Sequence, residues 1–337
     1  MEPVRWGILG TANIALAKVI PAMAGSHWAR IMAIASRDPE RAGAAARSAR
    51  IPRAYGTYEE LLADPGIEAI YNPLPNHLHV PWSIHAAEQG KHVLCEKPVA
   101  LSVKEARELL AVRDRTGVQI SEAFMVRSHP QWLKVRELTG SGRIGQLRLI
   151  HSQFSYSNRD PQNIRNRPEY GGGALMDIGC YPVTLARWLF GAEPEAVIAL
   201  IERDPDMRTD RLTSGMLRFD SGHATFDCST QLVPSQRLQV FGTTGRIEVE
   251  IPFNTPPEGA SRIHVDDGRD LRGRGIQTIE FAAVNQYTLQ CDEFSMAVRG
   301  LRAVPVPLED AIGNMAVIEA LFRSEESGRW EVPDASG

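Results

Sequence analysis

The chain has 337 residues, more than one hydrophobic core usually organises, so its length predicts two domains. Its composition, 43% hydrophobic and 23% charged residues, is typical of globular proteins and excludes a disordered or fibrous chain. The formal net charge of -4 argues against nucleic acid as a partner, because proteins that bind nucleic acid usually present a basic surface.

The sequence also predicts a cytoplasmic protein without membrane contact. Its apolar stretches are shorter than a bilayer span, and residues 1–5 lack the basic-then-apolar pattern of a signal peptide. The four cysteines have neither a paired spacing nor histidines at the spacing of a zinc site: Cys95, Cys180, Cys228 and Cys291. We therefore expect no disulfide and no metal ion.

Residues 1–122 alternate short apolar runs with helical patterns, which predicts a Rossmann domain with a doubly wound parallel sheet. Asp38 and Pro39 predict the start of a helix that runs to Ala49, because aspartate caps the first N–H groups and proline at the first position lacks one. Further helix boundaries are indicated by capping boxes and glycines: Thr57 with Glu60, Ser102 with Glu105, Gly90 and Gly117.

Residues 123–337 predict a second, α+β domain with a largely antiparallel, open-faced sheet, because strands follow one another with short turns beyond about residue 145. Apolar and charged residues alternate over 246–251, so this strand should have one buried and one open face. The other expected elements are hairpin turns at 220–222 and 242–245, a long loop at 254–275 and a last helix at 308–324.

The run 4–15 predicts a strand, a tight turn and the start of a helix. Gly10, Ala12 and Ala15 occupy the three positions of a GxGxxG dinucleotide-binding fingerprint, of which only the first is glycine. Small side chains let the backbone N–H groups of the turn approach a pyrophosphate. We expect the cofactor to contact Gly10, Thr11, Ala12, Asn13 and Ile14. The alternative is a plain strand-to-helix turn.

Ser36 and Arg37 stand at the end of the second predicted strand, where an Asp or Glu would hold the ribose of NAD. With no carboxylate there to repel a 2′-phosphate, and with a guanidinium able to bind it, NADP is favoured over NAD. The alternative is that Arg37 is a solvated surface residue.

Several motifs resemble one family. They are the alanine-rich turn after Gly10, NPLPNHLH at 72–79, EKP at 96–98, EAFM at 122–125 and GGGALMDIGCYP at 171–182. Together they span most of the chain and resemble the glucose-fructose oxidoreductase and inositol dehydrogenase (Gfo/Idh/MocA) family. Tyrosine at 181 resembles the branch of xylose dehydrogenases, dimeric dihydrodiol dehydrogenases and glucose-fructose oxidoreductase, since other branches have histidine there.

Lys97 is the first candidate for proton transfer. It follows a strand end at the carboxyl edge of the predicted parallel sheet, where open α/β folds bind their ligands. The resemblance implies that Lys97 reaches the substrate hydroxyl and that the bond between Lys97 and Pro98 is cis. The alternative is a surface salt bridge between Lys97 and Glu96.

Asp177 and Tyr181 lie four residues apart on a predicted helix, so their side chains share a face. A carboxylate can accept hydrogen bonds from sugar hydroxyls, and a tyrosine near a lysine can give or take a proton. The resemblance implies that Asp177 binds substrate and that Tyr181 acts with Lys97. The alternative is a local hydrogen bond between the two. The glycines at 171–173 indicate either a close approach of backbone to ligand or a flexible hinge.

Further cofactor contacts follow from the positions after strands and from the resemblance. These residues are Pro73, Leu74, Asn76, His77, Glu96, Lys97 and Arg165. For His77 the alternative is a helix cap, and for Arg165 a solvated loop. Arg127 and His129 follow the crossover between the domains, and they either reach the sugar or have a structural role.

These patterns predict an NADP-dependent oxidoreductase that moves a hydride between nicotinamide and a CH–OH or C=O carbon of a sugar, polyol or dihydrodiol. Lys97 and Tyr181 would move the proton, and Asp177 would bind the substrate. NAD is the less favoured cofactor, and the resemblance implies a homodimer or homotetramer. The alternatives are an NAD-dependent glycosidase of the same fold, a regulator that binds NADP without turnover, and a glucose-fructose oxidoreductase that holds NADP permanently.

Overall fold

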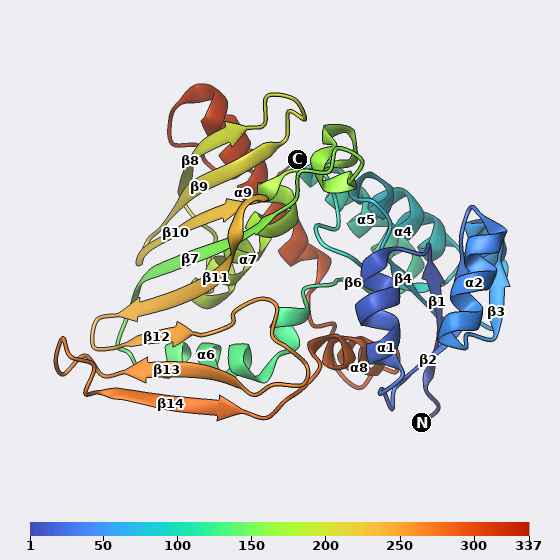
Figure 1. Cartoon of the computed structure of the whole chain (residues 1–337), viewed down its shortest axis with the longest axis horizontal. Helices are drawn as coiled ribbons and strands as arrows, with labels where there is room; N and C mark the ends of the chain where they lie inside the picture. The colour runs from blue at the N-terminus through green and yellow to red at the C-terminus, as the bar shows by residue number, and fades with distance from the viewer. Residues whose placement is uncertain (337) are drawn as a thin grey trace. The chain divides into compact units, whose positions relative to one another are not determined.

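The computed structural model describes residues 1–336, and the chain divides into two compact units (Figure 1). The first consists of Met1–Ser128 and Asn285–Ala311, and the second of His129–Val284 and the chain from Ile312 onward. The boundary expected from the sequence, between residues 122 and 123, treats each domain as one continuous range. The first compact unit instead takes in a second segment from near the C-terminus.

The first unit contains a six-stranded parallel sheet of order β3-β2-β1-β4-β5-β6. This is the strand order of the Rossmann fold, so the predicted doubly wound sheet is confirmed. Strands β1 and β4 are almost wholly buried, as expected for parallel strands that are covered on both faces. The strands are β1 (Val4–Leu9), β2 (Ala29–Ala35), β3 (Arg53–Tyr55), β4 (Ala69–Asn72), β5 (His92–Cys95) and β6 (Ile120–Glu122).

Helices α2, α3 and α5 have the caps that the sequence indicates. Asp38 accepts hydrogen bonds from two N–H groups of α2, the Thr57–Glu60 capping box is complete, Ser102 caps α5, and Gly117 ends it in a left-handed conformation. The bounds are η1 (Ala15–Val19), a π-helical turn, α1 (Ile20–Met23), α2 (Pro39–Ala49), α3 (Tyr58–Ala63), η2 (Asn76–Leu78), α4 (His79–Glu88), α5 (Val103–Thr116), η3 (Met125–Ser128) and α8 (Gln286–Val298).

Helix α8 belongs to the first unit and packs on its sheet, although it follows the second unit's strands in the sequence. The rings of Trp6 on β1 and Phe294 on α8 have centroids 5.4 Å apart, and the Trp6 Nε1–H donates to Ser295 Oγ at 3.2 Å. Both rings are fully buried. The apolar face of β1 therefore obtains its cover from a helix almost 300 residues away, because a sheet face must be buried by whichever element the chain returns to it.

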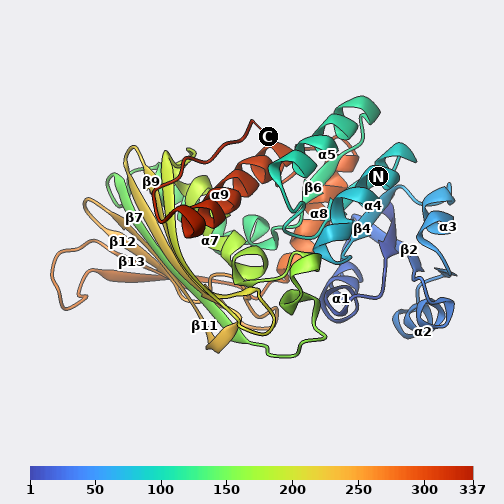
Figure 2. The ribbon, with the colours of Figure 1, turned by 90° about the horizontal axis from the view of Figure 1, so that it is seen from above.

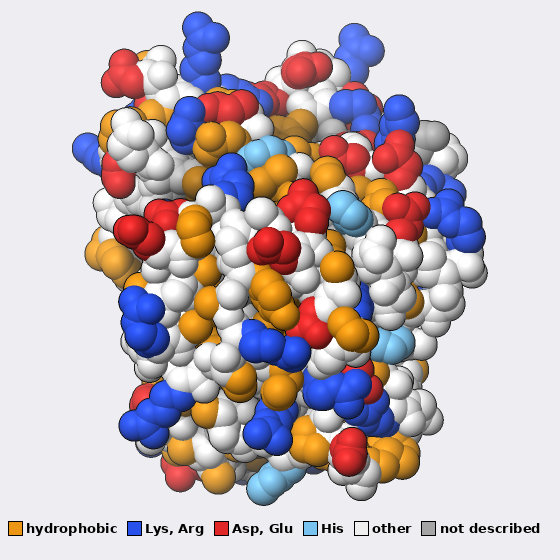
Figure 3. All heavy atoms as spheres, turned by 90° about the vertical axis from the view of Figure 1, so that its right-hand side faces the viewer, with side chains coloured by type: hydrophobic (Ala, Val, Ile, Leu, Met, Phe, Trp, Pro, Cys, Tyr) orange, Lys and Arg blue, Asp and Glu red, His pale blue; other side chains and the backbone are white. Residues whose placement is uncertain are grey.

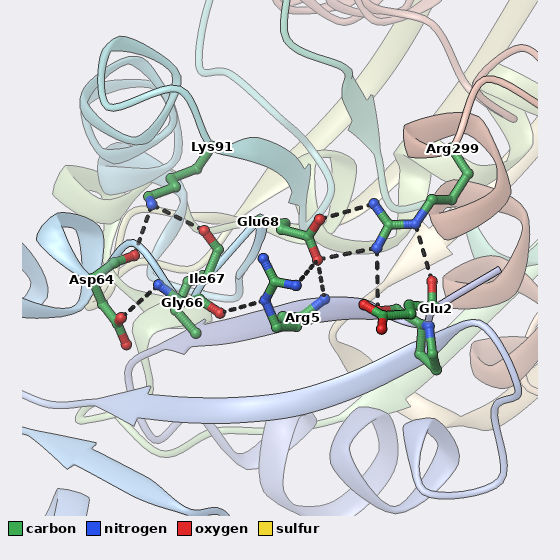
Figure 4. A network of polar contacts seen from close by, with 9 residues as sticks. Glu2, Arg5, Asp64, Gly66, Ile67, Glu68, Lys91 and Arg299 are labelled. Atoms are coloured by element: carbon green, nitrogen blue, oxygen red, sulfur yellow. Dashed lines mark hydrogen bonds and ion pairs between the residues drawn. The ribbon is translucent and has the colours of Figure 1, made fainter.

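A network of ion pairs also joins α8 to the amino end of this sheet (Figure 4). Glu68, which precedes β4, accepts hydrogen bonds from the Arg5 N–H at 3.0 Å and from two nitrogens of Arg299 at 2.9 and 3.1 Å. Arg299 follows α8 and also donates to the carbonyl oxygens of Glu2 and Pro3. The hydrogen bonding by Arg299 holds the pKa of Glu68 below its ordinary value.

We expect Glu68→Gln to lower the free energy of unfolding by about 1–2 kcal/mol at pH 7, the size of hydrogen bonds to a charged group. Because the folded-state pKa of Glu68 is lowered, its ionised form stabilises the fold above the ordinary carboxyl pKa. That contribution is lost as the pH falls through the folded-state pKa. Urea unfolding of variant and wild type across this range measures the difference. Glu280→Gln, which breaks an exposed pair with Arg262, is the control. Equal stabilities of Glu68→Gln and wild type at pH 7 would contradict the prediction.

The second unit contains an eight-stranded sheet of order β14-β13-β12-β11-β7-β10-β9-β8, in which only the β7–β10 pair is parallel. Figure 2 shows α7 and α9 on one side of this sheet. The predicted antiparallel α+β domain is therefore confirmed. Its strands are β7 (Leu147–Ser157), β8 (Ala196–Arg203), β9 (Asp210–Phe219), β10 (Gly222–Ser229), β11 (Gln231–Gly242), β12 (Arg246–Val249), β13 (Ser261–Asp266) and β14 (Ile276–Phe281). Its helices are α6 (Pro130–Gly140), η4 (Ile164–Asn166), η5 (Pro168–Tyr170), η6 (Leu175–Gly179), α7 (Cys180–Phe190) and α9 (Leu308–Ser327), which starts in the first unit.

Both expected hairpins are confirmed, but the long loop expected at 254–275 is wrong in part. Strand β13 lies within that segment and pairs with β12 and β14. Ile263 and Val265 are buried and alternate with more exposed residues, so the twofold alternation outweighs the local abundance of proline and glycine. The strand predicted over 246–251 ends earlier, at Val249, and the last helix runs on to Ser327.

Within residues 1–336 no helix has the length and apolar character needed to cross a membrane. The four cysteines are buried and form no disulfide. On the face that Figure 3 shows, Lys and Arg side chains are interspersed with Asp and Glu, so neither sign of charge dominates that face.

Candidate active site

The turn after β1 is tightly packed and begins with a glycine in a left-handed conformation. Gly10 has φ +81°, and a Cβ there would lie 3.0 Å from the Leu74 side chain. Its N–H donates to the Ala35 carbonyl at 2.8 Å, which ties the turn to β2. Ala15, at the third fingerprint position, is fully buried. The turn therefore requires glycine at position 10 and brings the helix N-terminus to the carboxyl edge of the sheet.

Ser36 and Arg37 lie at the same edge, directly after β2. Ser36 is buried, and its hydroxyl accepts a hydrogen bond from the Asp38 N–H at 3.2 Å, whereas Arg37 is exposed. The Asp38 carboxylate accepts from N–H groups of α2 and so serves as a helix cap. The end of β2 thus offers a hydroxyl and a guanidinium.

Tyr58 is a residue that sequence reasoning missed. It is 6% exposed, and its hydroxyl lies 3.6 Å from the Cβ position of Gly10. Burial raises the pKa of Tyr58, and the positive charge of Arg37 opposes this rise. The phenol therefore lies beside the turn and near the charge of Arg37. The sequence indicates only that Tyr58 is the first residue of a capped helix, because its contact with the Gly10 turn joins segments that are far apart in the chain.

The segment after β4 supports the turn from the other side. The Asn72 side chain donates to the His79 carbonyl at 3.0 Å and accepts from the Leu74 N–H at 3.3 Å, which fixes the path through Pro73. Leu74 is buried against Gly10, and Asn76 and His77 begin the short helical turn η2. Of the four predicted residues in this segment, Leu74 therefore packs directly on the Gly10 turn, and the other three lie next to it in the sequence.

Glu96 and Lys97 follow β5, again at the carboxyl edge. Glu96 accepts hydrogen bonds from the Tyr71 hydroxyl at 2.7 Å and from the Lys97 N–H at 3.3 Å. The Lys97–Pro98 peptide bond is cis, as the resemblance implies. Tyr287 on α8 is a further residue that the sequence analysis missed. Burial and the nearby Glu96 raise the pKa of Tyr287 to about 12, while the charge of Lys97 lowers it, so the phenol lies near both side chains.

His79 connects the segments after β4 and β5. It is fully buried, with Nδ1 2.7 Å from the Pro98 carbonyl and Nε2 2.7 Å from the Leu74 carbonyl. Burial lowers the pKa of His79 to about 4. The imidazole ring therefore links the backbone at Pro98, next to Lys97, to the backbone at Leu74, which packs on the Gly10 turn.

In the second unit, Asp177 lies in the π-helical turn η6 and is held by two side chains. It accepts hydrogen bonds from the Tyr156 hydroxyl at 2.6 Å and from Arg165 Nε at 3.0 Å. Arg165, predicted as a cofactor contact, is thus a partner of the predicted substrate residue. Tyr156 was not among the predicted site residues, because its position on β7 reveals nothing about the helix that packs on it.

Tyr181 follows Asp177 in the first turn of α7 and is 5% exposed. Its ring packs with Phe154 at 5.9 Å and Phe253 at 5.5 Å between centroids. Phe154 and Tyr156 are alternate residues of β7, so Tyr181 and Asp177 rest on the same face of that strand. The aromatic packing determines where the phenol lies.

Other predicted residues have structural contacts. Arg127 forms an ion pair with Asp310 at 3.2 Å, and His129 caps α6 by accepting from the Gln131 N–H. Burial lowers the pKa of His129 to about 4. A Cβ on Gly172 would lie 2.5 Å from the Arg165 carbonyl, so at this glycine the close approach is to protein backbone. Among residues 1–336 no three His, Cys, Asp or Glu side chains are grouped so as to hold a metal ion.

Comparison with protein families gives two matches along the chain. A model described as "Oxidoreductase family, NAD-binding Rossmann fold" matches residues 4–124, and one described as "GFO/IDH/MocA C-terminal domain" matches residues 132–248. The chain belongs to the Gfo/Idh/MocA oxidoreductase family. The resemblance carried by the short motifs is thereby confirmed.

Individual members of the Gfo/Idh/MocA family are similar over nearly their full length. An uncharacterized oxidoreductase of Rhizobium meliloti is 49% identical, with 98% of this chain and 99% of that protein covered. A D-xylose 1-dehydrogenase (NADP(+)) of Haloferax volcanii is 39% identical, with 96% and 98% covered. The crystal structure of a 3-ketoreductase from Actinomadura kijaniata in complex with NADP and TDP-benzene matches with a TM-score of 0.87 and 28% identity, covering 96% of this chain and 98% of that one. As a Gfo/Idh/MocA protein, this chain is an oxidoreductase of the dehydrogenase and reductase class, and the prediction of such an enzyme is confirmed.

Proposed function

We propose that the protein is an NADP-dependent oxidoreductase that interconverts a CH–OH and a C=O group on a sugar, polyol or dihydrodiol. The observation that carries the proposal is the position of Lys97, after β5 at the same sheet edge as the Gly10 turn after β1. Relatives named as a D-xylose dehydrogenase and a sugar 3-ketoreductase support the substrate class.

The residues at the carboxyl edge fit NADP. The turn at Gly10 leaves no side chain between the backbone and a pyrophosphate, and Arg37 is an exposed cation at the end of β2. The remaining proposed contacts are Thr11, Ala12, Asn13, Ile14, Ser36, Pro73, Leu74, Asn76, His77, Glu96 and Arg165. Bound NADP supplies the acceptor or donor of the hydride.

The protein's own residues bind the substrate and move the proton. We assign the hydroxyl proton to Lys97 and Tyr181, because an ammonium and a phenol can each give or take a proton at a substrate oxygen. The Asp177 carboxylate accepts hydrogen bonds from substrate hydroxyls while Tyr156 and Arg165 keep it oriented.

A spectrophotometric panel of aldoses, ketoses and diols with NADP and NAD tests the proposed function. We expect NADPH formation with at least one polyhydroxylated compound. Two other functions make different predictions. A glycosidase would hydrolyse an aryl glycoside and form no NADPH from free sugars, and a regulator would bind NADP without any turnover. A permanently held cofactor would stay bound on dialysis, whereas we expect its release.

The preference for NADP should depend on Arg37. We expect Arg37→Ala to reduce the ratio of kcat/KM for NADP to that for NAD roughly 10- to 100-fold, because charge-assisted hydrogen bonds to a phosphate are lost. Tyr58→Phe should change the ratio by a smaller factor, since it removes a hydroxyl near Arg37 but keeps the guanidinium. Arg30→Ala, an exposed arginine at the other end of β2, is the control. An unchanged ratio in Arg37→Ala would show that another group selects the cofactor.

We also propose a homodimer or homotetramer that buries part of the eight-stranded sheet. Leu200 on β8 is 78% exposed, and Met216 on the neighbouring strand is 39% exposed and pairs with Ile198. Exposed apolar side chains on adjacent strands indicate a protein contact. We expect Leu200→Asp to lower the mass measured by analytical ultracentrifugation to that of a monomer, whereas Leu133→Asp on α6 leaves it unchanged. A wild-type protein that already sediments as a monomer would refute this assembly.

A further inference from the structure

Asp210 is a buried carboxylate that none of the proposed chemistry uses. It is the first residue of β9 and is 1% exposed. Burial raises its pKa to about 7, whereas its hydrogen bonds and the charge of Arg203 on β8 lower it. Burial and, to a smaller extent, the charge of Asp210 keep the pKa of the Cys228 thiol on β10 well above its ordinary value. A carboxylate in such surroundings costs stability, so its contacts need an explanation.

The contacts of Asp210 converge on the start of the helix that carries Asp177 and Tyr181. Its Oδ2 accepts hydrogen bonds from the Leu175 N–H at 2.6 Å and from the Thr213 hydroxyl at 3.2 Å. Leu175 is the first residue of η6. A negative group at this end of a helix also interacts favourably with the helix dipole. Asp210, at the start of β9, therefore holds the first turn of the helix.

Gly173 connects Asp210 to both partners in the candidate site. A Cβ on Gly173 would lie 1.8 Å from Asp210 Oδ1, and the residue has φ +119°, so only glycine fits there. Its N–H donates to the Arg165 carbonyl at 2.8 Å, and its carbonyl accepts from the Asp177 N–H at 3.0 Å. The backbone of Arg165 and that of Asp177 are thus both attached to the residue that rests on Asp210.

We propose that Asp210 is a positioning residue for substrate binding: by fixing Gly173 and Leu175, it sets the relative placement of the Asp177 carboxylate and the Arg165 guanidinium. The proposal rests on the proposed function, in which Asp177 binds substrate hydroxyls. The proposal also explains why position 173 is glycine: the backbone there packs closely on the buried carboxylate of Asp210, rather than approaching a ligand or serving as a hinge.

A double-mutant cycle tests this proposal. We expect Asp210→Ala to reduce kcat/KM about tenfold or more, the effect of losing a hydrogen bond to a charged group, with the larger part in KM. Asp210→Asn keeps an acceptor for the Leu175 N–H and should stay within about threefold of the wild type. If Asp210 acts through Asp177, then Asp210→Ala has less than about a twofold effect in an Asp177→Asn background, because residues that act as a unit are not additive. Equal losses in both backgrounds, or full activity of Asp210→Ala, would overturn the proposal.

Two glycines in the same helical stretch provide a matched comparison. Gly173→Ala should reproduce the loss of kcat/KM, because the new Cβ takes the place of the carboxylate oxygen. Gly191→Ala is the control: Gly191 also has a positive φ, ends the same helix and has open space at its Cβ position. Equal effects of the two substitutions would count against the proposal. If Asp210→Ala fails to fold, Thr213→Val enters the same cycle, with an expected loss of about threefold that vanishes in the Asp177→Asn background.

A measurement that needs no substrate separates this proposal from the proposed function. Hydrogen exchange of the Leu175 and Asp177 amides should be faster in Asp210→Ala than in the wild type, and unchanged in Gly191→Ala. A wild type that transfers no hydride with any compound would refute the proposed function. Unchanged exchange at both amides in Asp210→Ala would refute the anchoring role of Asp210, whatever the protein's activity.

Discussion

Lys97→Ala is expected to lower kcat/KM by about 10²- to 10⁴-fold, the usual contribution of a positioned proton donor or acceptor. The side chain would no longer reach the substrate oxygen, while the backbone around it should keep its path. The backbone N–H of Lys97 donates to Glu96, and the backbone N–H of Val99 donates to Glu122 at 2.8 Å. Neither hydrogen bond involves the ammonium group. Initial rates of NADPH formation and consumption measure the effect.

The control for this prediction is Lys104→Ala, which truncates an exposed lysine on α5 and should keep wild-type rates. Titration of protein fluorescence with NADPH shows whether Lys97→Ala still binds cofactor, and we expect a change in the dissociation constant much smaller than the change in rate. A Lys97→Ala protein with the activity of the wild type would remove Lys97 from the mechanism.

Tyr181→Phe is expected to reduce kcat/KM by about 10²-fold or more, because it removes one of the two groups able to move the proton. The substitution keeps the ring, and with it the packing on Phe154 and Phe253, so the melting temperature should hardly change. Tyr55→Phe, which loses a hydroxyl bonded to Asp64 away from the proposed chemistry, is the control.

The pH dependence of the two variants identifies the group that carries the proton. If Tyr181 carries it, Lys97→Ala should keep a residual activity whose pH profile follows the titration of a phenol. If Lys97 carries it, Tyr181→Phe should retain the wild-type profile at a lower rate. Full activity in Tyr181→Phe would restrict this residue to packing.

Much of the fold could be predicted because its signals are local. The cap at Asp38 and the capping box at Thr57 act within four residues of themselves, and the structure contains both. Alternation of apolar and charged residues over 246–251 predicted a strand for the same reason, and the structure has one over Arg246–Val249. Where local signals disagree, as over 254–275, pairing with neighbouring strands decided the outcome, and no single segment contains that information.

The partners of the candidate site residues could not be predicted in this way. Asp177 in η6 accepts a hydrogen bond from Tyr156 on β7, and the Leu175 N–H donates to Asp210, which lies 35 residues further along the chain. Each of these contacts requires that distant segments be packed first. The glycines at 171–173 likewise indicate that side chains do not fit there, but the sequence does not show that Arg165 and Asp210 are the neighbours that exclude them.

The sequence by itself determined the class of the two sheets, the tight turn at Gly10 and the protein family, because these depend on short-range periodicity and on motifs. Only the tertiary structure decided that α8 covers β1, that Arg165 pairs with Asp177 and that Asp210 accepts a hydrogen bond from the first residue of η6. The physical reason is that burial and hydrogen bonding between distant segments depend on which surfaces the folded chain brings together.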